Sequence, residues 1–564
     1  MKLLKFRPLL KRFMPLSIQA KLAKISYIKQ IRYWLGINIF LVKKLKSQLG
    51  TKNILVAGGD KFHGVRVLLP LIETSHYQYY QLIVLAKALE LRGAQVKVLV
   101  CDGQLDGCEI KSVKNSNESN PCSKCQLNIK KVLPLFGLQI IKLSDVFSKK
   151  TLEEFGVTAK RLVASELETI CEYGIDLKQS IEDSVVRYYY GAVPVSSEIV
   201  NEVREKHTNT ALMAIKLAKY FDETWSPNIV LSGMASYSAW EPYYRYFTKY
   251  GKRFRQISLS QFNFKSVVFN SFELFPAFER FKKYMEKREG DCRLNEQELQ
   301  LLYSFINRRH SGKSDIFTID KYFSNNEISK DVASALALNK SKRNIFLFSN
   351  LYWDVGLSDR KGLFDGVLAW VETTIEILKD LPNCHLYVKP HPAEVFGSTA
   401  SLRGVSEIIK KNYPGGISNL TVIEPEWKLL PYNCFPHIDL GVVFTGTLGL
   451  EMALADIPVV STGMTSHRGL GITAEPDSIE SYRAMLLGEV TLPKVDKDYL
   501  EMFAYFYFIR TLIPWTLTKQ AYADNFDGFS FNELEDLFRG KDKYLDHLCD
   551  CILDSHNTVP EAYP

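Results

Sequence analysis

The sequence predicts an α/β protein built from two doubly wound, Rossmann-like domains that face a cleft. Short apolar runs alternate with helical segments along both halves of the chain, the order that builds parallel sheets covered by helices. The chain has 564 residues, 46% of them hydrophobic, which is too long for one hydrophobic core. We predict an arm at 1–50, a first domain at 51–300, a linker at 301–340, a second domain at 341–498 and a helical tail at 499–564.

The first half shows one complete strand–helix–strand unit. Its helix is expected at 77–92, where Leu82, Leu85 and Leu89 share one face and Gly93 follows as a C-terminal cap. The β-branched run at 95–101 is typical of a buried parallel strand. Further strands are expected at 53–57, 65–71, 228–231 and 255–259, with helices at 210–221 and 240–250.

The second half repeats this order more clearly, after a charged, irregular stretch at 286–343. Ligands bind such sheets beyond the carboxyl ends of the strands, so the loops that follow the strands are the candidate sites. Strands are expected at 344–349, 385–388, 421–423, 439–444 and 457–461, with helices at 364–379, 401–411 and 448–455; the tail is expected to be helical and to pack back across the first domain.

The positive charge of the chain is concentrated in the arm. Residues 1–50 hold twelve Lys or Arg and no acid, which leaves 59 basic and 63 acidic residues elsewhere, so the body does not resemble a nucleic-acid binder. Apolar residues from Ile18 to Leu35 recur every three or four positions between the lysines, which predicts a basic amphipathic helix lying on an anionic membrane surface. The alternative is a helix packed on the protein body with a solvated basic face.

Two motifs in the second half could hold a phosphate. Thr445, Gly446 and Thr447 end a strand and open a helix, where free backbone N–H groups and hydroxyls bind anions, and Glu451 lies one turn further on. The alternative is an ordinary helix cap with a glycine for close packing. In Lys389-Pro390-His391-Pro392, the prolines fix a histidine at a strand end, from which it could donate to a phosphate or protonate a leaving phosphate oxygen. Lys389 is a further candidate for a contact with the donor, although strand alternation would point it to the other face. The alternative is a rigid turn with a surface histidine.

Weaker candidates lie elsewhere around the expected cleft. Asn350 belongs to a loop, 349–354, that could line the same crevice or be an ordinary polar loop. In the first domain, Asp60, Glu73 and His76 are candidates for the base that takes a proton from an acceptor hydroxyl, although each alone is more often structural.

Four cysteines are spaced C-x6-C-x13-C-x2-C, which is compatible with a structural zinc site or with plain thiols; they are Cys101, Cys108, Cys122 and Cys125. Four thiolate ligands would leave no open position for catalysis, so a zinc ion bound there would be structural.

The second half resembles the capsule polysaccharide biosynthesis family of glycosyltransferases, related to Kdo and sialic-acid transferases. The resemblance spans about 120 residues and is carried by 348–350, 353–354, Phe364, Trp370, 389–394, 445–451 and 457–460; 92–93, 98–103 and Cys122–Cys125 resemble the first domain of these proteins. It implies a GT-B fold, phosphate contacts from His391, Thr445 and Thr447, a ribose contact from Glu451, and an inverting, metal-independent transfer. Relatives often carry consecutive Ser or Thr where Gly446 stands.

The leading hypothesis is therefore a GT-B glycosyltransferase with a nucleotide-sugar donor, possibly CMP-linked, and a glycan or lipid-linked acceptor of capsule or lipopolysaccharide. The alternatives are a CDP-glycerol-type glycerophosphotransferase and a non-catalytic glycan- or nucleotide-binding scaffold. The start of the chain lacks a secretory signal pattern, so a cytoplasmic protein, peripheral on the inner face of the cell membrane, is expected.

Overall fold

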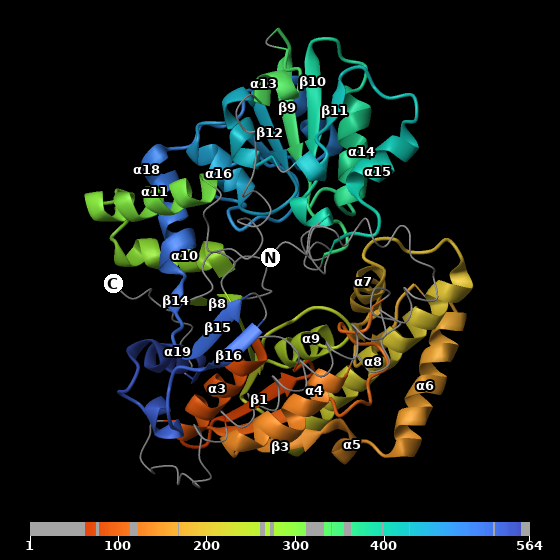
Figure 1. The fold of residues 1–564 in the computed structure, drawn as a ribbon, viewed down its shortest axis with the longest axis vertical. Helices are drawn as coiled ribbons and strands as arrows, with labels where there is room; N and C mark the ends of the chain where they lie inside the picture. The colour runs from red at the N-terminus through yellow and green to blue at the C-terminus, as the bar shows by residue number, and fades with distance from the viewer. Residues whose placement is uncertain are drawn as a thin grey trace, which may run out of the picture.

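The computed structural model contains two sheets, each in its own lobe (Figure 1). It describes Leu45 and residues 62–74, 78–112, 122–166, 168–259, 266–270, 276–311, 332–339, 341–354, 362–395, 400–427, 429–522 and 525–553. The predicted arm, apart from Leu45, and the predicted strand at 53–57 lie outside these residues.

The first lobe holds a seven-stranded sheet in the order β14-β8-β7-β6-β1-β2-β3. The five strands β3-β2-β1-β6-β7 are parallel and follow the doubly wound order, while β8 and β14 add an antiparallel edge. The strands are β1 Arg66–Leu71, β2 Gln95–Val100, β3 Gln139–Lys142, β6 Ile229–Ser232, β7 Arg253–Leu259, β8 Ser266–Asn270 and β14 Ile513–Pro514.

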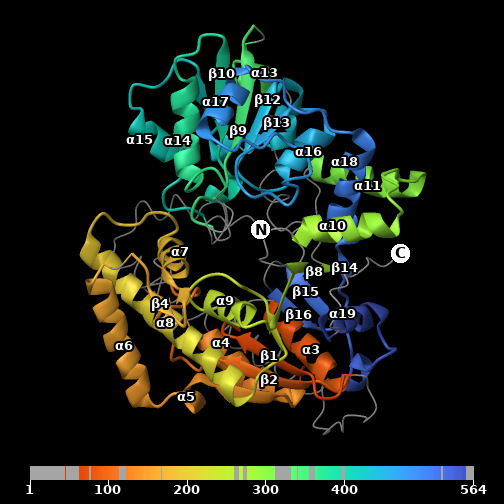
Figure 2. The same cartoon turned by 180° about the vertical axis from the view of Figure 1, so that it is seen from behind.

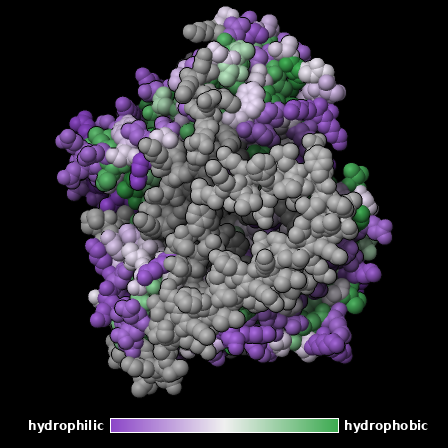
Figure 3. Space-filling view, in the orientation of Figure 1, coloured by the Kyte–Doolittle hydropathy of each residue, from purple (hydrophilic) through white to green (hydrophobic). Residues whose placement is uncertain are grey.

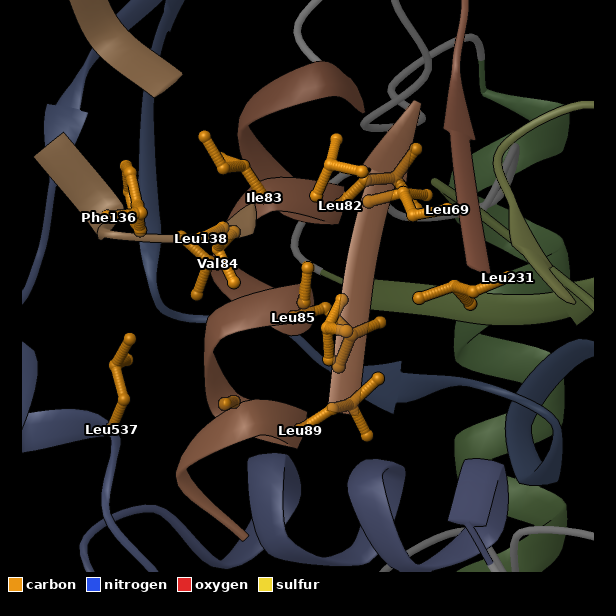
Figure 4. Packing of buried hydrophobic residues seen from close by; sticks show 14 of the residues in the cluster. Leu69, Leu82, Ile83, Val84, Leu85, Leu89, Phe136, Leu138, Leu231 and Leu537 are labelled. Carbon is orange, nitrogen blue, oxygen red and sulfur yellow. The ribbon is translucent and has the colours of Figure 1, made fainter. Parts of the chain in front are cut away.

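Both faces of this sheet are buried, as a parallel sheet requires. Along β1, Val67, Leu69 and Leu71 pack in one core cluster, while Leu68 and Ile72 pack in the cluster on the opposite face. Figure 4 shows Leu69 of β1 and the leucines of helix α3, among them Leu82, on the first of these faces. The helices are α3 Gln78–Leu91, α4 Ser123–Leu127, α5 Leu143–Val146, α6 Lys149–Ala164, α7 Lys178–Tyr188, α8 Ser197–Thr224 and α9 Glu241–Lys249, with a small hairpin of β4 Cys171–Glu172 and β5 Ile175–Asp176.

The second lobe holds a five-stranded, wholly parallel sheet in the order β11-β10-β9-β12-β13. Its strands are β9 Arg343–Phe348, β10 Cys384–Lys389, β11 Leu420–Val422, β12 Leu440–Val443 and β13 Val459–Ser461, and its helices are α14 Val367–Leu378, α15 Val405–Asn412, α16 Leu448–Leu454 and α17 Ile479–Leu487. Two Rossmann-like domains of this kind confirm the predicted fold class. The strand–helix order expected from the sequence is present in both lobes, with most ends shifted by a few residues. The exception is α8, which begins at Ser197 where the sequence predicted a start at Thr210.

The stretch expected to be irregular, 286–343, is partly helical. It contains the end of α10 Pro276–Lys287, the whole of α11 Glu296–His310 and the short α13 Val332–Ala335. Helix α11 begins with a capping box, in which Asn295 and Glu298 each accept a backbone N–H of the other residue. Its apolar face packs with α18 Lys497–Tyr505 in one aromatic-rich cluster. High local charge masked this helix, whose buried positions Leu302, Phe305, Ile306 and Arg309 recur at the three- and four-residue spacing of one helix face.

The tail returns to the first lobe, as expected, but it is not wholly helical. After α18 and the π-helical turn Phe506–Arg510, it forms β14, the hairpin β15 Thr518–Tyr522 and β16 Asn525–Phe529, and then helix α19 Lys543–Leu553. Residues from this segment belong to the same core cluster as β1 and α3. Arg92 joins the two parts, because its fully buried guanidinium donates to Leu537 O (3.0 Å) and forms an ion pair with Asp546.

The two lobes are connected on both sides of the molecule. Helices α10, α11 and α18 lie between the lobes on one side, and α7 reaches toward the second lobe on the other (Figures 1 and 2). Hydrophilic residues cover much of the described surface in the space-filling view (Figure 3). Among the described residues, no helix is both long and apolar enough to cross a bilayer.

Candidate functional site

The carboxyl ends of four adjacent strands are aligned in the second lobe. Lys389 of β10 is in register with Phe348 of β9, Phe348 with Val443 of β12, and Val443 with Ser461 of β13. The loops that follow these strands therefore leave the sheet from one edge, and they include the segments 349–354, 390–395 and 444–447. The two phosphate motifs of the sequence do converge on this edge, where ligands of such sheets bind.

His391 is the exposed member of this group. It precedes the 3₁₀ turn Pro392–Glu394, and its Nδ1 accepts the backbone N–H of Ala393 (3.1 Å). Desolvation by the surrounding protein, assisted by the positive charge of Lys389, lowers the pKa of His391 to about 4. The imidazole is therefore neutral near pH 7, and because Nδ1 accepts a bond, its proton lies on Nε2. His391 therefore has its Nε2–H available as a hydrogen-bond donor, and its catalytic role stays a prediction.

Lys389, unlike His391, is buried rather than exposed. Its side chain is buried on the face of the sheet that also carries Tyr387, and its pKa is lowered to about 8 by burial, with Cys434 close by. Alternation along β10 explains this position, because residues two apart share a face. The contact of Lys389 with the donor stays a prediction, and it would require the Lys389 side chain to leave its buried position on this face of the sheet.

Asn350 and the segment 445–447 lie together at the end of β9 and β12. The side-chain Oδ1 of Asn350 accepts the backbone N–H of Thr445 (3.3 Å). Gly446 is exposed and has φ +103°, a conformation that side chains of L-residues rarely adopt. A Cβ at Gly446 would lie 3.9 Å from Asn350 Nδ2, so the amide N–H₂ of Asn350 and the bare backbone of Gly446 face each other.

Glu451 is fully buried and has partners within the chain. Its Oε1 accepts from the Thr447 hydroxyl (2.8 Å) and from Arg309 (3.0 Å), and its Oε2 accepts from Arg309 Nε (3.2 Å). Arg309 comes from α11, so this buried ion pair fixes α11 to the first turn of α16. The predicted ribose contact of Glu451, which nothing in the structure tests, would require Arg309 to withdraw. Sequence reasoning missed Arg309 because it lies 142 residues from its partner.

Of the candidate bases in the first domain, only Glu73 lies within the described residues; Asp60 and His76 do not. Glu73 is half-buried just after β1, and its charge raises the pKa of Cys108, Cys125 and Glu109. It therefore lies beside the cysteine-rich segment that follows β2.

The four cysteines lie close enough to interact, but they are not arranged as ligands of a metal ion. Cys101 and Cys122 interact electrostatically, as do Cys108 and Cys125, while burial raises the thiol pKa of Cys101, Cys108 and Cys125. Within the part of the chain that the structure describes, no three Cys, His, Asp or Glu side chains are arranged to hold a metal ion. A structural zinc ion at these thiols stays a prediction, which metal analysis of the purified chain would decide.

A contact between the lobes lies beside this site. Arg187, in α7, stacks on the rings of Tyr190 (5.3 Å) and Trp353 (5.0 Å), and Trp353 belongs to the loop after β9. The hydroxyl of Tyr352 donates to Gly191 O (2.8 Å) across the same boundary. The 349–354 loop, expected to line the crevice, is therefore also the point at which the second lobe contacts the first.

No protein-family model matches the sequence, and no curated protein sequence matches it either. Among solved structures, the chain is similar to KpsC, beta Kdo 2,4 transferase, of Thermosulfurimonas dismutans, with 14% identity over 50% of this chain and 79% of that one and a TM-score of 0.33. It is also similar to a putative UDP-N-acetylglucosamine 2-epimerase from Listeria monocytogenes (12% identity, 88% and 99% covered, TM-score 0.25) and to the calicheamicin glycosyltransferase CalG4 (10% identity, 78% and 92% covered, TM-score 0.21). At these TM-scores the site residues, rather than the likenesses, carry any statement about function.

Proposed function

We propose that this chain is a glycosyltransferase whose nucleotide-sugar donor binds at the carboxyl edge of the second sheet. The observation that carries the proposal is the convergence of His391, Asn350 and the segment 445–447 on the ends of β9, β10 and β12. Together they present a neutral imidazole N–H, a side-chain amide and an exposed glycine backbone. These groups suit the phosphate oxygens of a nucleotide diphosphate or monophosphate.

The acceptor would approach from the first lobe, where Glu73 is the described candidate for the base that takes its hydroxyl proton. The family resemblance favours a lipid-linked or surface glycan acceptor and an inverting transfer without a bound metal. The anomeric configuration of the product, measured by NMR, would decide the stereochemistry. The basic arm would hold the protein at an anionic membrane surface, which a vesicle-binding assay with the full chain and a chain lacking residues 1–50 would test.

A nucleotide-binding experiment tests the donor site. Thermal shift with CMP, CDP, UMP, UDP and GDP should give stabilisation by one of them, because a ligand at a hundred times its dissociation constant adds about 2.7 kcal/mol to the stability of the native state. His391→Ala should weaken that binding at least about tenfold, the effect of losing roughly 1.4 kcal/mol from one phosphate contact. His391 is exposed, so the substitution should leave the fold intact.

His437→Ala is the matched control. His437 ends the 3₁₀ segment Pro431–His437, just before the amino end of β12, and therefore lies at the opposite edge of the sheet. Its removal should leave nucleotide binding unchanged. Equal effects of the two substitutions, or no shift with any nucleotide, would contradict the proposed donor site.

The reaction products distinguish the proposed glycosyltransferase from the two alternative functions. A glycerophosphotransferase would release CMP from CDP-glycerol and transfer phosphorus to the acceptor. A scaffold would bind nucleotide without turnover. The site geometry does not favour either over sugar transfer.

A further inference from the structure

A buried ion pair adjoins the segment 445–447, which is proposed to hold the donor phosphate. Arg309, in the last turn of α11, is 8% exposed, and Glu451 of α16 is fully buried. The guanidinium binds the carboxylate through two atoms, with Nη2 3.0 Å from Oε1 and Nε 3.2 Å from Oε2. The hydroxyl of Thr447 donates to the same Oε1 (2.8 Å). Arg309 and the donor segment therefore share one carboxylate oxygen as their hydrogen-bond acceptor.

Apolar and aromatic contacts hold the end of α11 in this position. Phe305, on the buried face of α11, packs in one core cluster with Leu450 of α16. The ring of His310 stacks on that of Tyr432, with centroids 4.2 Å apart and planes at 26°. Burial, and then the charge of Glu451, raises the pKa of the Tyr432 hydroxyl. The end of α11 is thus held by several contacts, and the guanidinium meets the carboxylate in a defined geometry.

Without a cation, Glu451 would be an unfavourable neighbour for a phosphate. A carboxylate repels a phosphate bound close to it, and the repulsion is stronger in the protein interior because charges are screened less there than in water. The two-atom contact with Arg309 offsets the carboxylate charge. The segment 445–447 therefore adjoins a neutral pair rather than an unpaired anion.

The same contacts direct the hydrogen of the Thr447 hydroxyl. An ionised carboxylate only accepts hydrogen bonds, so this hydrogen points to Glu451. Both oxygens of Glu451 already accept bonds from within the chain, and the side chain is fully buried. A ribose hydroxyl could reach the carboxylate only if Arg309 or Thr447 turned away. Glu451 is thus arranged to hold the donor segment rather than to contact a ribose.

We propose, on the basis of the proposed function, that Arg309 is a positioning residue of the donor site. It neutralises Glu451, fixes the segment 445–447 through the shared oxygen, and keeps its contact with Glu451 while the donor is bound. The donor is then recognised at its phosphates, without a ribose contact from Glu451. The end of α11, within the stretch 301–340 that the sequence predicted to be a linker, becomes part of the donor site.

The test compares nucleotide binding by wild type, Arg309→Met and the double variant Arg309→Met/Glu451→Gln. Calorimetry would use UDP, UMP, CDP, CMP and GDP, each beside its 2′-deoxy analogue. Arg309→Met should bind the preferred nucleotide at least about tenfold more weakly, because an unpaired carboxylate then repels the phosphate. The double variant should recover the wild-type affinity, because it removes the carboxylate charge together with its partner.

The 2′-deoxy analogues test whether Glu451 contacts the ribose. The ratio of ribonucleotide affinity to deoxyribonucleotide affinity should be the same in wild type and in the double variant. A preference for the ribonucleotide that wild type shows and the double variant loses would mean that the ion pair opens for the ribose. That result would overturn the inference.

Arg288→Met is the matched control. Arg288 is also partly buried and pairs with a glutamate of α11, Glu298, at 3.0 Å, but at the amino end of the helix. Loss of this pair removes a contact of α11 without touching Glu451 or the segment 445–447. Nucleotide affinity should therefore stay at the wild-type value.

The outcomes are distinct. If wild type binds no nucleotide, the proposed function fails, and the inference fails with it. If wild type binds a nucleotide and Arg309→Met binds it equally well, the inference alone is wrong. It is also wrong if the double variant binds as weakly as Arg309→Met, since the loss is then structural. Should Arg309→Met not fold, Arg309→Lys keeps the charge but loses the two-atom contact, and should weaken binding by a smaller factor. Unchanged binding by Arg309→Lys would then contradict the positioning role.

Discussion

Glu394 shows how one buried carboxylate supports the site. It follows His391 by three residues and is buried, and both its oxygens accept the backbone N–H of Val405 (3.2 and 3.1 Å). A Cβ on Gly404 would lie 2.7 Å from Glu394 Oε2, which explains the glycine there. The side chain of Glu394 thus holds the start of α15 against the turn that carries His391.

The protonation of Glu394 should make stability depend on pH. Burial, and then the charges of Glu426 and Glu424, raise its pKa from 4.5 to about 8. Between these values the native state binds the proton and the unfolded chain does not, so stability falls as pH rises. Glu394→Gln should abolish this loss and be the more stable protein above pH 8, by on the order of 2 kcal/mol. Melting curves at pH 5 and pH 8.5 would test this, and parallel profiles would contradict it.

Arg92 adds polar contacts to the hydrophobic core that α3 and α19 share. Arg92 directly follows α3, and its side chain is fully buried. Its guanidinium donates to Ala88 O (2.8 Å) and Leu537 O (3.0 Å) and forms an ion pair with Asp546. Figure 4 shows Leu537 among the buried hydrophobic residues that pack with α3. The tail is therefore attached to the first lobe by polar contacts as well as by its core.

Removal of Arg92 should destabilise the protein strongly. Arg92→Ala leaves Asp546 and a buried carbonyl without their partner, a change that costs about 3–5 kcal/mol when a buried ion pair is broken. Denaturant unfolding would measure it. Arg161→Ala, which removes an exposed arginine near the end of α6, should change stability by less than about 0.5 kcal/mol. Similar losses for the two variants would show that the α3–α19 contact adds nothing.

At the scale of the whole molecule, α10, α11 and α18 connect the lobes on one side and the contact around Gly191 connects them on the other. There, Gly191 has φ +84° and a Cβ would lie 2.3 Å from Tyr352 Oη. Tyr352 also donates to Arg403 O (3.1 Å), and Leu402 N donates to Tyr190 O (3.0 Å). This side of the molecule is closed by a small contact that combines these hydrogen bonds with the packed rings of Tyr190 and Trp353, and the other side by the larger aromatic-rich cluster of α10, α11 and α18.

Gly191→Ala should open the side of the molecule on which Gly191 contacts Tyr352. The new methyl group displaces Tyr352, so small-angle scattering should show a larger radius of gyration, and turnover should fall while nucleotide affinity changes little. Gly251→Ala is the control, because Gly251 has a similar φ of +72° and a Cβ there would meet nothing within 4 Å. An unchanged radius in Gly191→Ala, or an equal change in both variants, would contradict this role.

The sequence predicted what depends on local pattern. Strand ends followed by small polar residues located His391, Asn350 and Thr445, because parallel strands place their carboxyl ends at one edge. Partners distant in sequence were not predictable: Arg309 is separated from Glu451 by 142 residues, and Tyr352 from Gly191 by 161. Arg309 lay in the stretch predicted to be a linker and in no recognisable motif.

The return of the tail to the first lobe has a consequence for synthesis. The core around β1 and α3 includes Trp515, Phe529, Leu548 and Ile552. A ribosome delivers these residues only after the whole five-stranded sheet and its helices have emerged, since that lobe ends with α17 at Leu487. The second lobe can therefore complete its core while the first, although begun earlier, still exposes apolar surface. On the ribosome, the half that is translated first is the half that finishes folding last.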